Sequence, residues 1–389
     1  MKKKILFITP SLCQGGLEHS LVTMLKLLDE NKYEMYLYTY SDDLSLLPMI
    51  PDYVTVKNDL LNKHYNRNIK ALFLLSAEKV LKILKTKKSA VYAEKRKAFI
   101  HDQRINQIKK AYPNCLFDVV IANSIGKTTE MAAVVKAKKR YVFFHSSLDL
   151  HHELLVQLLP EFDKIVAVNQ GVKDMLCSSY NDIEEKVYVI ENYIDAEKII
   201  RKSEKQILED SFSKYSNVII GTCGRISKEK GFDLAVNAAE YLKNQNVSFH
   251  WLFIGDGSER PTIECTIKEK GLSNYITITG YKDNPFPYMR KCVIYVQPSY
   301  EEAQPLVLLE AMALGKPIVS TKTVGGKIIL QDGQKGILTE FTGESLAEGI
   351  LSLINNPKKL HSFENLYTLE ENEKEKQIYI EKINEILSD

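Results

Sequence analysis

The feature that most constrains the fold is an alternation of short apolar segments with longer stretches of helical periodicity. Six such segments lie in the first half of the chain and five in the second half. Strands that are apolar on both faces occur in parallel sheets covered by helices on each side. We therefore predict an α/β chain with two doubly wound parallel sheets. The segments are KILFIT, EMYLYTY, DVVIAN, RYVFFH, KIVAVN and KVYVIEN, then VIIGTCGR, SFHWLFIG, YITITG, CVIYVQP and KPIVST.

A polar stretch separates the two series of strands and sets the predicted domain boundary. It follows NYID at 192–195 and ends before the strand that begins at 218. We predict Rossmann-like domains at 1–196 and 197–365, and a final charged helix at 366–389. Two such domains have a cleft between them, and ligands of these sheets bind at the carboxyl ends of the strands.

The apolar runs and the cysteines exclude several protein classes. No apolar run reaches the roughly 18–20 residues of a membrane span. The apolar run at the N-terminus is too short for a signal peptide and fits a first strand. The six cysteines are scattered without CxxC or zinc-ligand spacing, as in a reduced cytoplasmic protein. We therefore expect no metal site.

Positive charge is concentrated in one segment of the first half. Residues 62–110 hold fourteen Lys or Arg and three Asp or Glu, a net charge of +11 within a total of +2, so the rest of the chain carries −9. Apolar residues recur there with helical spacing among the lysines. One interpretation is a solvated helical hairpin. The other is that Lys63–Lys110 binds an anionic membrane surface. Nucleic acid is not expected, because no nucleic-acid-binding motif accompanies the charge.

Two glycine-containing loops follow a predicted strand and open a helix. In SLCQGGLEHS, Gly16 lets the backbone approach a ligand, and the helix N-terminus offers N–H groups to an anion. In GTCGRISKEKGFDLAV, Gly224 ends the strand, and Arg225 and Lys230 suit a diphosphate. Neither loop has a dinucleotide or Walker fingerprint. The alternatives are an empty glycine-rich turn in the first loop and two solvated cations in the second.

Carboxylates accompany the helix in PSYEEAQPLVLLEAMALGKPIVST. Pro305 suits the first helical position, and the helix N-terminus with Leu306 and Val307 is predicted to meet phosphate oxygens. Glu302 would accept sugar hydroxyls. Glu310 lies about 80° around the helix from Glu302. It either reaches the same cleft from one turn deeper or extends to water.

Taken together, these motifs resemble the nucleotide-sugar signature of family 4 glycosyltransferases, which are retaining enzymes of the GT-B fold. E-x7-E runs from Glu302 to Glu310, and GGLEHS, GRISKEKGFD, IGDGSE and VGG…DG…G recur in the expected order and spacing. The resemblance covers nearly the whole chain. It implies two Rossmann-like domains facing a cleft, with the acceptor on the first, the nucleotide sugar on the second, and the last helix crossing back to the first. The chain resembles the members of this family that assemble bacterial cell-surface polysaccharides.

The resemblance also implies roles for individual residues. Those that meet the diphosphate are Gly16, Arg225 and Lys230, while Glu302 holds the sugar hydroxyls and Glu310 the ribose. The base of the nucleotide is implied to lie near Gly280 and Tyr281. His145 is implied to contact the donor sugar, the alternative being a histidine that only ends its strand. The predicted catalytic residues are thus Arg225, Lys230, Glu302 and His145, and the predicted donor-binding residues are Gly16, Gly224, Tyr281, Pro305, Leu306, Val307 and Glu310.

The sequence departs from the family pattern at two places. Ala303-Gln304-Pro305 stands where many members have Gly-Phe-Gly, and KIILQ follows Gly325-Gly326 where Pro-Glu is common. Both departures concern the identity of the donor sugar more than the class of reaction. No D-x-D motif occurs, so fixed cations rather than a metal are expected to stabilise the leaving diphosphate.

The implied reaction moves a hexose or N-acetylhexosamine from a nucleoside-diphosphate sugar, UDP being the commoner nucleotide, to a glycan acceptor that is lipid-linked. The donor is a substrate, and no cofactor is expected. A cytoplasmic enzyme, peripheral on the inner face of the membrane, would fit this reaction. Two alternatives are a nucleotide-sugar 2-epimerase, with Glu18 and His19 as candidate groups, and a non-catalytic partner subunit of a transferase. An idle subunit should have lost Arg225, Lys230 or Glu310, and all three are present.

Overall fold

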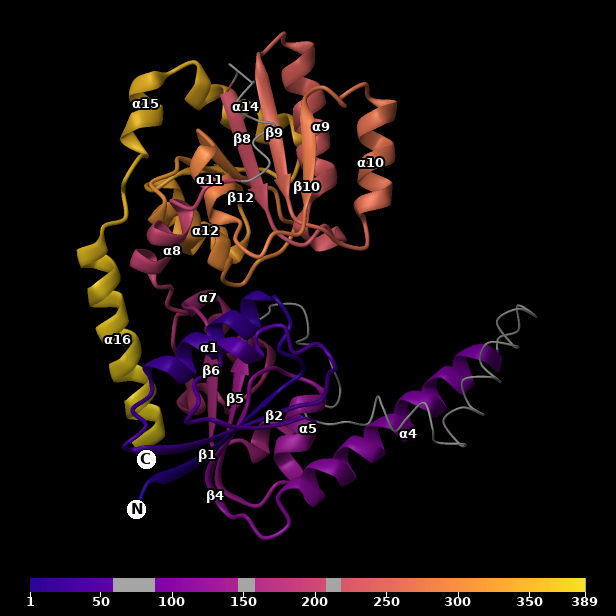
Figure 1. The fold of residues 1–389 in the computed structure, drawn as a ribbon, viewed down its shortest axis with the longest axis vertical. Coiled ribbons are helices and arrows are strands. Elements are labelled where there is room, and N and C mark those ends of the chain that lie inside the picture. Colours follow the sequence, from indigo (N-terminus) through magenta and orange to yellow (C-terminus); the bar gives the residue numbers. More distant parts are fainter. Residues whose placement is uncertain (59–87, 146–157, 208–217, 389) are drawn as a thin grey trace. The chain divides into compact units, whose positions relative to one another are not determined.

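The computed structural model describes residues 1–58, 88–145, 158–207 and 218–388. It divides the chain into two compact units, each built on its own parallel sheet (Figure 1). The first unit is Met1–Ile190 with the chain from Ile380 onward, and the second is Glu191–Tyr379. The predicted α/β class with two parallel sheets is confirmed. The boundary lies six residues before the predicted one.

The sheet of the first unit has seven parallel strands in the order β3-β2-β1-β4-β5-β6-β7. All six apolar segments predicted here lie in strands, and the short strand β3 was not predicted. The strands are β1 (Lys3–Thr9), β2 (Tyr33–Thr39), β3 (Thr55–Asn58), β4 (Phe117–Ala122), β5 (Ala137–Phe144), β6 (Lys164–Ala167) and β7 (Val187–Val189).

The helices of the first unit connect these strands and also include the end of the chain. The α-helices are α1 (Gly16–Leu27), α4 (Lys88–Ala111), α5 (Lys127–Val134) and α7 (Gln170–Ser179), with the last turns of α16 (Leu369–Ser388); the 3-10 helices are η1 (Leu47–Met49), η2 (Leu159–Glu161) and η3 (Glu184–Lys186).

The C-terminal end of α16 is held by two lysines of the first sheet. Lys164 Nζ donates to the carbonyl of Ile386 at 3.1 Å, and Lys3 Nζ donates to the carbonyl of Ser388 at 3.1 Å. Positive charge at this end of a helix is favourable, because the last carbonyl groups lack intrahelical donors. The helix end is therefore part of the fold of the first unit.

The sheet of the second unit has six parallel strands in the order β10-β9-β8-β11-β12-β13. The five predicted segments form five of these strands, and β13 was not predicted. The strands are β8 (Val218–Cys223), β9 (Phe249–Ile254), β10 (Ile276–Gly280), β11 (Ile294–Gln297), β12 (Ile318–Thr321) and β13 (Ile337–Thr339).

Helices cover both faces of this second sheet, as the apolar strands require. Trp251 and Phe253 of β9 pack in one hydrophobic cluster with α9 and α14, whereas Leu252 and Ile254 pack in another with α8, α11 and α12. The alternation follows the two-residue period of a strand. The α-helices are α8 (Ala196–Ser203), α9 (Phe232–Asn244), α10 (Arg260–Glu269), α11 (Phe286–Lys291), α12 (Leu306–Ala313), α13 (Val324–Ile329), α14 (Gly343–Ile354), α15 (Pro357–Ser362) and the start of α16; the 3-10 helices are η4 (Lys228–Lys230) and η5 (Gln331–Gly333).

The strand order of both sheets reverses at the first strand of each unit. Strand β1 lies between β2 and β4, and β8 lies between β9 and β11. In doubly wound sheets, ligands bind at the carboxyl ends of the strands next to such a switch point. In the second unit, this rule selects the loops that follow β8 and β11.

The basic segment is only partly within the described residues, because 59–87 lie outside them. Those residues include Lys82, Lys85 and Lys87. The described part is α4, which extends well beyond the sheet of its unit (Figure 1). Its C-terminal end packs against the unit through the fully buried Ile108. Among the described residues, no helix is both long enough and apolar enough to span a membrane.

Candidate functional site

The loops that follow β8 and β11 lie against each other at the switch point of the second sheet. Gly231 ends the turn η4 with a φ of 65°, and a Cβ atom there would lie 2.0 Å from the carbonyl oxygen of Pro298. Only glycine tolerates both this backbone conformation and this close approach. The close approach brings Lys230, the preceding residue, beside the loop after β11.

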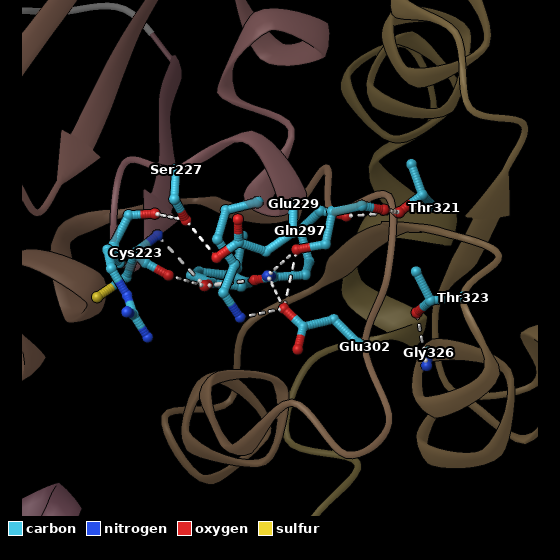
Figure 2. A network of polar contacts seen from close by, with 12 residues as sticks. Cys223, Ser227, Glu229, Gln297, Glu302, Thr321, Thr323 and Gly326 are labelled. Carbon is cyan, nitrogen blue, oxygen red and sulfur yellow. Dashed lines mark hydrogen bonds and ion pairs between the residues drawn. The ribbon is translucent and has the colours of Figure 1, made fainter. Parts of the chain in front are cut away.

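The two loops meet in a hydrogen-bonded ion pair. Oε1 of Glu302 accepts from Lys230 Nζ at 2.6 Å, from Ser299 Oγ at 2.9 Å and from Gln297 Nε2 at 3.1 Å (Figure 2). The Glu302 side chain is 9% exposed. Oε2 accepts no hydrogen bond from any described residue. One carboxylate oxygen is therefore held by three protein donors, while the other is open to a ligand hydroxyl.

Arg225 lies in the same loop as Lys230 and is exposed. It follows Gly224 at the end of β8. Burial acts to raise the pKa of the nearby Glu229 carboxyl, but a hydrogen bond from Ser227 and the charges of Arg225 and Lys230 bring it below its usual value. Among the described residues, no ion pair holds the Arg225 guanidinium. Its charge is thus available to an anionic ligand.

The start of α12 offers backbone donors close to Glu302 in the chain. Pro305 is the N-cap, one position before the predicted one, and no side chain caps the helix. Leu308 donates the first helical hydrogen bond, to the carbonyl of Pro305 at 3.0 Å. The N–H groups of Leu306 and Val307 precede that bond and are suited to phosphate oxygens.

Glu310 lies in the middle of α12 and keeps part of its surface exposed. Burial raises the pKa of its carboxyl to about 7, although the ammonium group of Lys202 acts to lower it. No described residue donates a hydrogen bond to this carboxylate. Its charge also acts on the thiol of Cys223 and the phenol of Tyr295, so the three groups lie close together. A ligand hydroxyl would satisfy the carboxylate.

Gly280 and Tyr281 lie at the carboxyl end of β10, on the same edge of the sheet. Gly280 has a φ of 72°, and the Tyr281 side chain is 51% exposed. Nearby, Arg260 pairs with Asp256 at 2.7 Å and with Glu264 at 2.8 Å. An exposed aromatic ring at this position is suited to stack on a planar ligand group.

The remaining two predicted residues, Gly16 and His145, belong to the first unit. Gly16 is the exposed first residue of α1, but the first turn of that helix already holds Glu18, which is 7% exposed. Oε1 of Glu18 accepts from Ser11 Oγ at 2.5 Å. This buried carboxylate already occupies the positive end of the helix, so the end is less favourable for an additional anion than the sequence suggested.

His145 follows β5, and burial lowers the pKa of its imidazole to about 4. Its Nε2 is buried and has no hydrogen-bond partner among the described residues. Asn123, at the end of the adjacent strand β4, is fully buried, and neither polar atom of its side chain has a partner within the described part of the chain. Two unsatisfied polar groups therefore lie at neighbouring strand ends of the first sheet. No motif in the sequence singles out Asn123.

The structure thus brings most of the predicted residues of the second unit to one edge of its sheet. The residues it adds are Ser299 and Gln297, which donate to Glu302, and Tyr295, which contacts Gln297. Their sequence signal is three polar side chains at alternate positions, two in the apolar strand IYVQ and one in its loop. Within the described ranges, no group of three or more His, Cys, Asp or Glu residues is placed to hold a metal ion.

The segment that contains this site has a recognisable family signature. Residues 183–366 match the family model described as glycosyl transferases group 1. This group 1 segment includes all six strands of the second sheet and both partners of the Lys230–Glu302 pair.

Relatives of the chain carry glycosyltransferase names. One from Campylobacter jejuni is named N-acetylgalactosamine-N,N'-diacetylbacillosaminyl-diphospho-undecaprenol 4-alpha-N-acetylgalactosaminyltransferase. It is 27% identical over 220 residues, which cover 56% of this chain and 58% of that protein. An alpha-D-kanosaminyltransferase from Streptomyces kanamyceticus is 29% identical over 171 residues, covering 43% of this chain and 44% of that protein. The chain thus spans about half the length of these relatives.

Solved structures are similar over the full length. HepE of Anabaena, in complex with UDP, has a TM-score of 0.71 and 19% identity, and the match covers 100% of both chains. TarM of S. aureus has a TM-score of 0.67 and 14% identity, covering 99% of this chain and 97% of that one. These similarities establish the fold, which is GT-B with two Rossmann-like domains.

Proposed function

We propose that the protein is a retaining glycosyltransferase that uses a nucleoside-diphosphate sugar, with UDP as the nucleotide. The observation that carries this proposal is the Lys230–Glu302 pair, which lies beside the uncapped N-terminus of α12 within the group 1 segment. A cation, free amides and a carboxylate with one open oxygen match the parts of such a donor. The transferred group is a hexose or an N-acetylhexosamine.

The leaving diphosphate would be stabilised by fixed positive groups. Arg225 is exposed and has no ion-pair partner among the described residues, and Lys230 uses one of its three N–H donors on Glu302. The N–H groups of Leu306 and Val307 add two further donors. Together they would neutralise the charge that develops on the diphosphate, so the reaction would not depend on a divalent metal.

The carboxylates would bind the hydroxyl groups of the donor. Oε2 of Glu302 accepts from the transferred sugar, and Glu310 accepts from the ribose. At physiological pH, a carboxyl with a pKa of about 7 is only partly ionised, and hydroxyl donors would favour its charged form. The ring of Tyr281 would stack on the base.

In the transfer step, the bond between the anomeric carbon and the diphosphate oxygen breaks, and the acceptor oxygen bonds to the same carbon on the same face. The acceptor proton passes to the departing phosphate oxygen, so no protein general base is assigned. Front-face attack of this kind retains the anomeric configuration.

The acceptor is proposed to be a lipid-linked glycan bound by the first unit. The Campylobacter relative carries diphospho-undecaprenol in its name, which supports a lipid-linked substrate. Helix α4 holds seven Lys or Arg and two Asp or Glu, a net charge of +5. Such a helix suits an anionic membrane surface. We place the enzyme in the cytoplasm, peripheral on the inner face of the membrane, in cell-surface polysaccharide assembly.

A donor screen tests the proposal directly. A ligand at 100-fold its dissociation constant should stabilise the protein by about 2.7 kcal/mol. UDP-, GDP- and ADP-sugars are compared by thermal shift, and the best donor is then assayed for transfer to lipid-linked glycans. The anomeric configuration of the product, measured by NMR, tests retention. If no nucleotide sugar stabilises the protein, the proposal is wrong.

A further inference from the structure

Strand β11 carries two polar side chains in the core of the second unit. Tyr295 is fully buried and Gln297 is 2% exposed, and the two point to the same face because they are two residues apart. Burying such groups is costly unless every polar atom has a partner. Their partners form a chain of hydrogen bonds that leads to Glu302 (Figure 2).

The chain starts at the backbone of β8. The hydroxyl of Tyr295 accepts from the N–H of Cys223 at 3.3 Å and lies 3.2 Å from the carbonyl of Cys223. The same hydroxyl donates to Oε1 of Gln297 at 2.9 Å. The backbone of β8 thus fixes the phenol, and the phenol contacts the side-chain carbonyl oxygen of Gln297.

The amide nitrogen of Gln297 then faces two acceptors. It donates to Ser299 Oγ at 2.7 Å and to Glu302 Oε1 at 3.1 Å. The reverse orientation of the amide would place its oxygen against the carboxylate oxygen of Glu302, and neither oxygen could donate to the other. The phenol could then still donate to the carbonyl of Cys223, so the contact with Glu302 decides the orientation of the amide. Gln297 is therefore a fixed donor to Glu302.

Lys230 alone would hold the carboxylate through a flexible side chain. Gln297 and Ser299 add two donors from short, buried side chains to the same oxygen, Oε1. Three donors on one oxygen fix the position of Oε1. Oε2, which accepts from no described residue, is thereby left for a ligand.

We propose that Gln297, oriented by Tyr295, is a positioning residue that holds the Glu302 carboxylate so that Oε2 receives a hydroxyl of the donor sugar. This inference rests on the proposed function. It predicts that the Tyr295–Gln297 pair determines affinity for the sugar part of the donor and not for its nucleotide. If the pair were purely structural, its removal would lower the stability of the second unit and would weaken binding of the sugar and of the nucleotide alike.

The test uses Tyr295→Phe, which removes one hydroxyl, and Gln297→Met, which keeps the length of the side chain. Tyr193→Phe is the matched control, because it removes another buried phenol of the same unit, one that donates to Asn372 at 3.2 Å. Dissociation constants are measured for UDP and for whichever of UDP-glucose, UDP-galactose, UDP-N-acetylglucosamine and UDP-N-acetylgalactosamine binds the unaltered protein most tightly.

We expect both β11 variants to bind UDP within about twofold of the unaltered protein, and to bind the UDP-sugar roughly tenfold more weakly, the value of about one hydrogen bond. The control should match the unaltered protein for both ligands. In a Glu302→Ala background, Tyr295→Phe should cause no further loss, because the phenol acts through Glu302.

Several results would overturn the proposal. These are unchanged affinity for the UDP-sugar, an equal loss for UDP and the UDP-sugar, or losses that add in the Glu302→Ala background. Failure of the unaltered protein to bind any of these ligands would overturn the proposed function itself. Because the unaltered protein is measured first, this outcome is distinguished from a failure of the Tyr295–Gln297 proposal.

Discussion

The ammonium nitrogen of Lys230 lies 2.6 Å from Oε1 of Glu302. The pair joins the loop after β8 to the loop after β11 across the switch point of the second sheet. It links the cation proposed to meet the diphosphate with the carboxylate proposed to hold the sugar. Any change in one partner therefore also alters the charge around the other.

Replacing Lys230 tests the cation directly. We expect Lys230→Ala to lower turnover by roughly 10²–10³-fold, the usual effect of removing one fixed group that stabilises transition-state charge. The variant also leaves Glu302 without its ion pair. Lys228→Ala is the control, because Lys228 is an exposed lysine of the same 3-10 turn. Near-normal turnover of Lys230→Ala would contradict the role.

Arg225 and the response to EDTA test whether fixed cations suffice. We expect Arg225→Ala to lose a similar factor in turnover, and Arg225→Lys to recover part of it, because lysine restores the charge without the bidentate geometry. The unaltered enzyme should keep its full rate in EDTA. Loss of activity in EDTA that Mg²⁺ restores would show that a metal carries the charge instead.

Glu310→Gln separates a ligand-binding carboxylate from a structural one. We expect nucleotide affinity to fall by roughly tenfold or more, the value of a hydrogen bond to a charged group. Folding stability at pH 8 should hold or rise, because the change removes a partly buried carboxylate that accepts no hydrogen bond from the described residues. A melting temperature lower by many degrees with unchanged affinity would instead indicate a structural partner.

The pH dependence of stability should reveal His145 and Glu310 as opposing groups. Burial lowers the pKa of His145 from 6.5 to about 4. Its contribution to the free energy of unfolding is therefore present above pH 6.5 and is lost as the pH falls toward 4. Glu310 has its pKa raised from 4.5 to about 7, so its contribution is present below pH 4.5 and is lost as the pH rises toward 7. Each pKa shift corresponds to a change of at most about 3 kcal/mol in the free energy of unfolding.

The two effects therefore partly cancel in the unaltered protein, and single variants should separate them. In urea titrations at pH 5 and pH 7.5, His145→Gln should be less destabilised by acid than the unaltered protein. Glu310→Gln should be less destabilised by base. Parallel pH profiles for all three proteins would show that neither group is shifted.

Liposome sedimentation tests the membrane interpretation of the basic segment. Binding should require anionic lipid, weaken with salt, and fall when the exposed residues Lys95, Lys109 and Lys110 become Gln. The control changes three exposed lysines of the second unit, Lys205, Lys268 and Lys358, for the same change in net charge. Equal binding to neutral and anionic vesicles, or none, would leave α4 as a solvated helix.

The sequence predicts the two sheets because their central strands are apolar on both faces. It misses β3 and β13, which are short strands at the sheet edges. The compact units divide at 190/191 rather than at the predicted 196/197, and this difference has a physical reason. Asn372 donates to the carbonyl of Ile194 at 2.8 Å and accepts from the N–H of Ala196 at 3.2 Å, so these residues join the second unit. No local pattern reveals a contact about 180 positions away along the chain.

For the site, charge and spacing select Lys230, Glu302 and Glu310, since a carboxylate inside an apolar helix is conspicuous. The direct contact of Lys230 with Glu302 depends on Gly231 lying against Pro298, which is a tertiary relationship. The role of Gln297 is also a tertiary one, because a polar residue at the end of an apolar strand has many ordinary explanations and only its contact with Glu302 singles it out.

Helix α16 has a consequence for synthesis of the protein. The first unit takes strand β1 from residues 3–9, yet it also contains Ile383, Ile386 and Leu387, all nearly inaccessible to solvent, which follow the whole of the second unit in the chain. On the ribosome, the segment before Ile190 must therefore wait until residues 380–388 have been made before its apolar surface is covered. The nascent first unit stays incomplete while the whole of the second unit is synthesised, and a truncation at about residue 379 would leave it permanently unfinished.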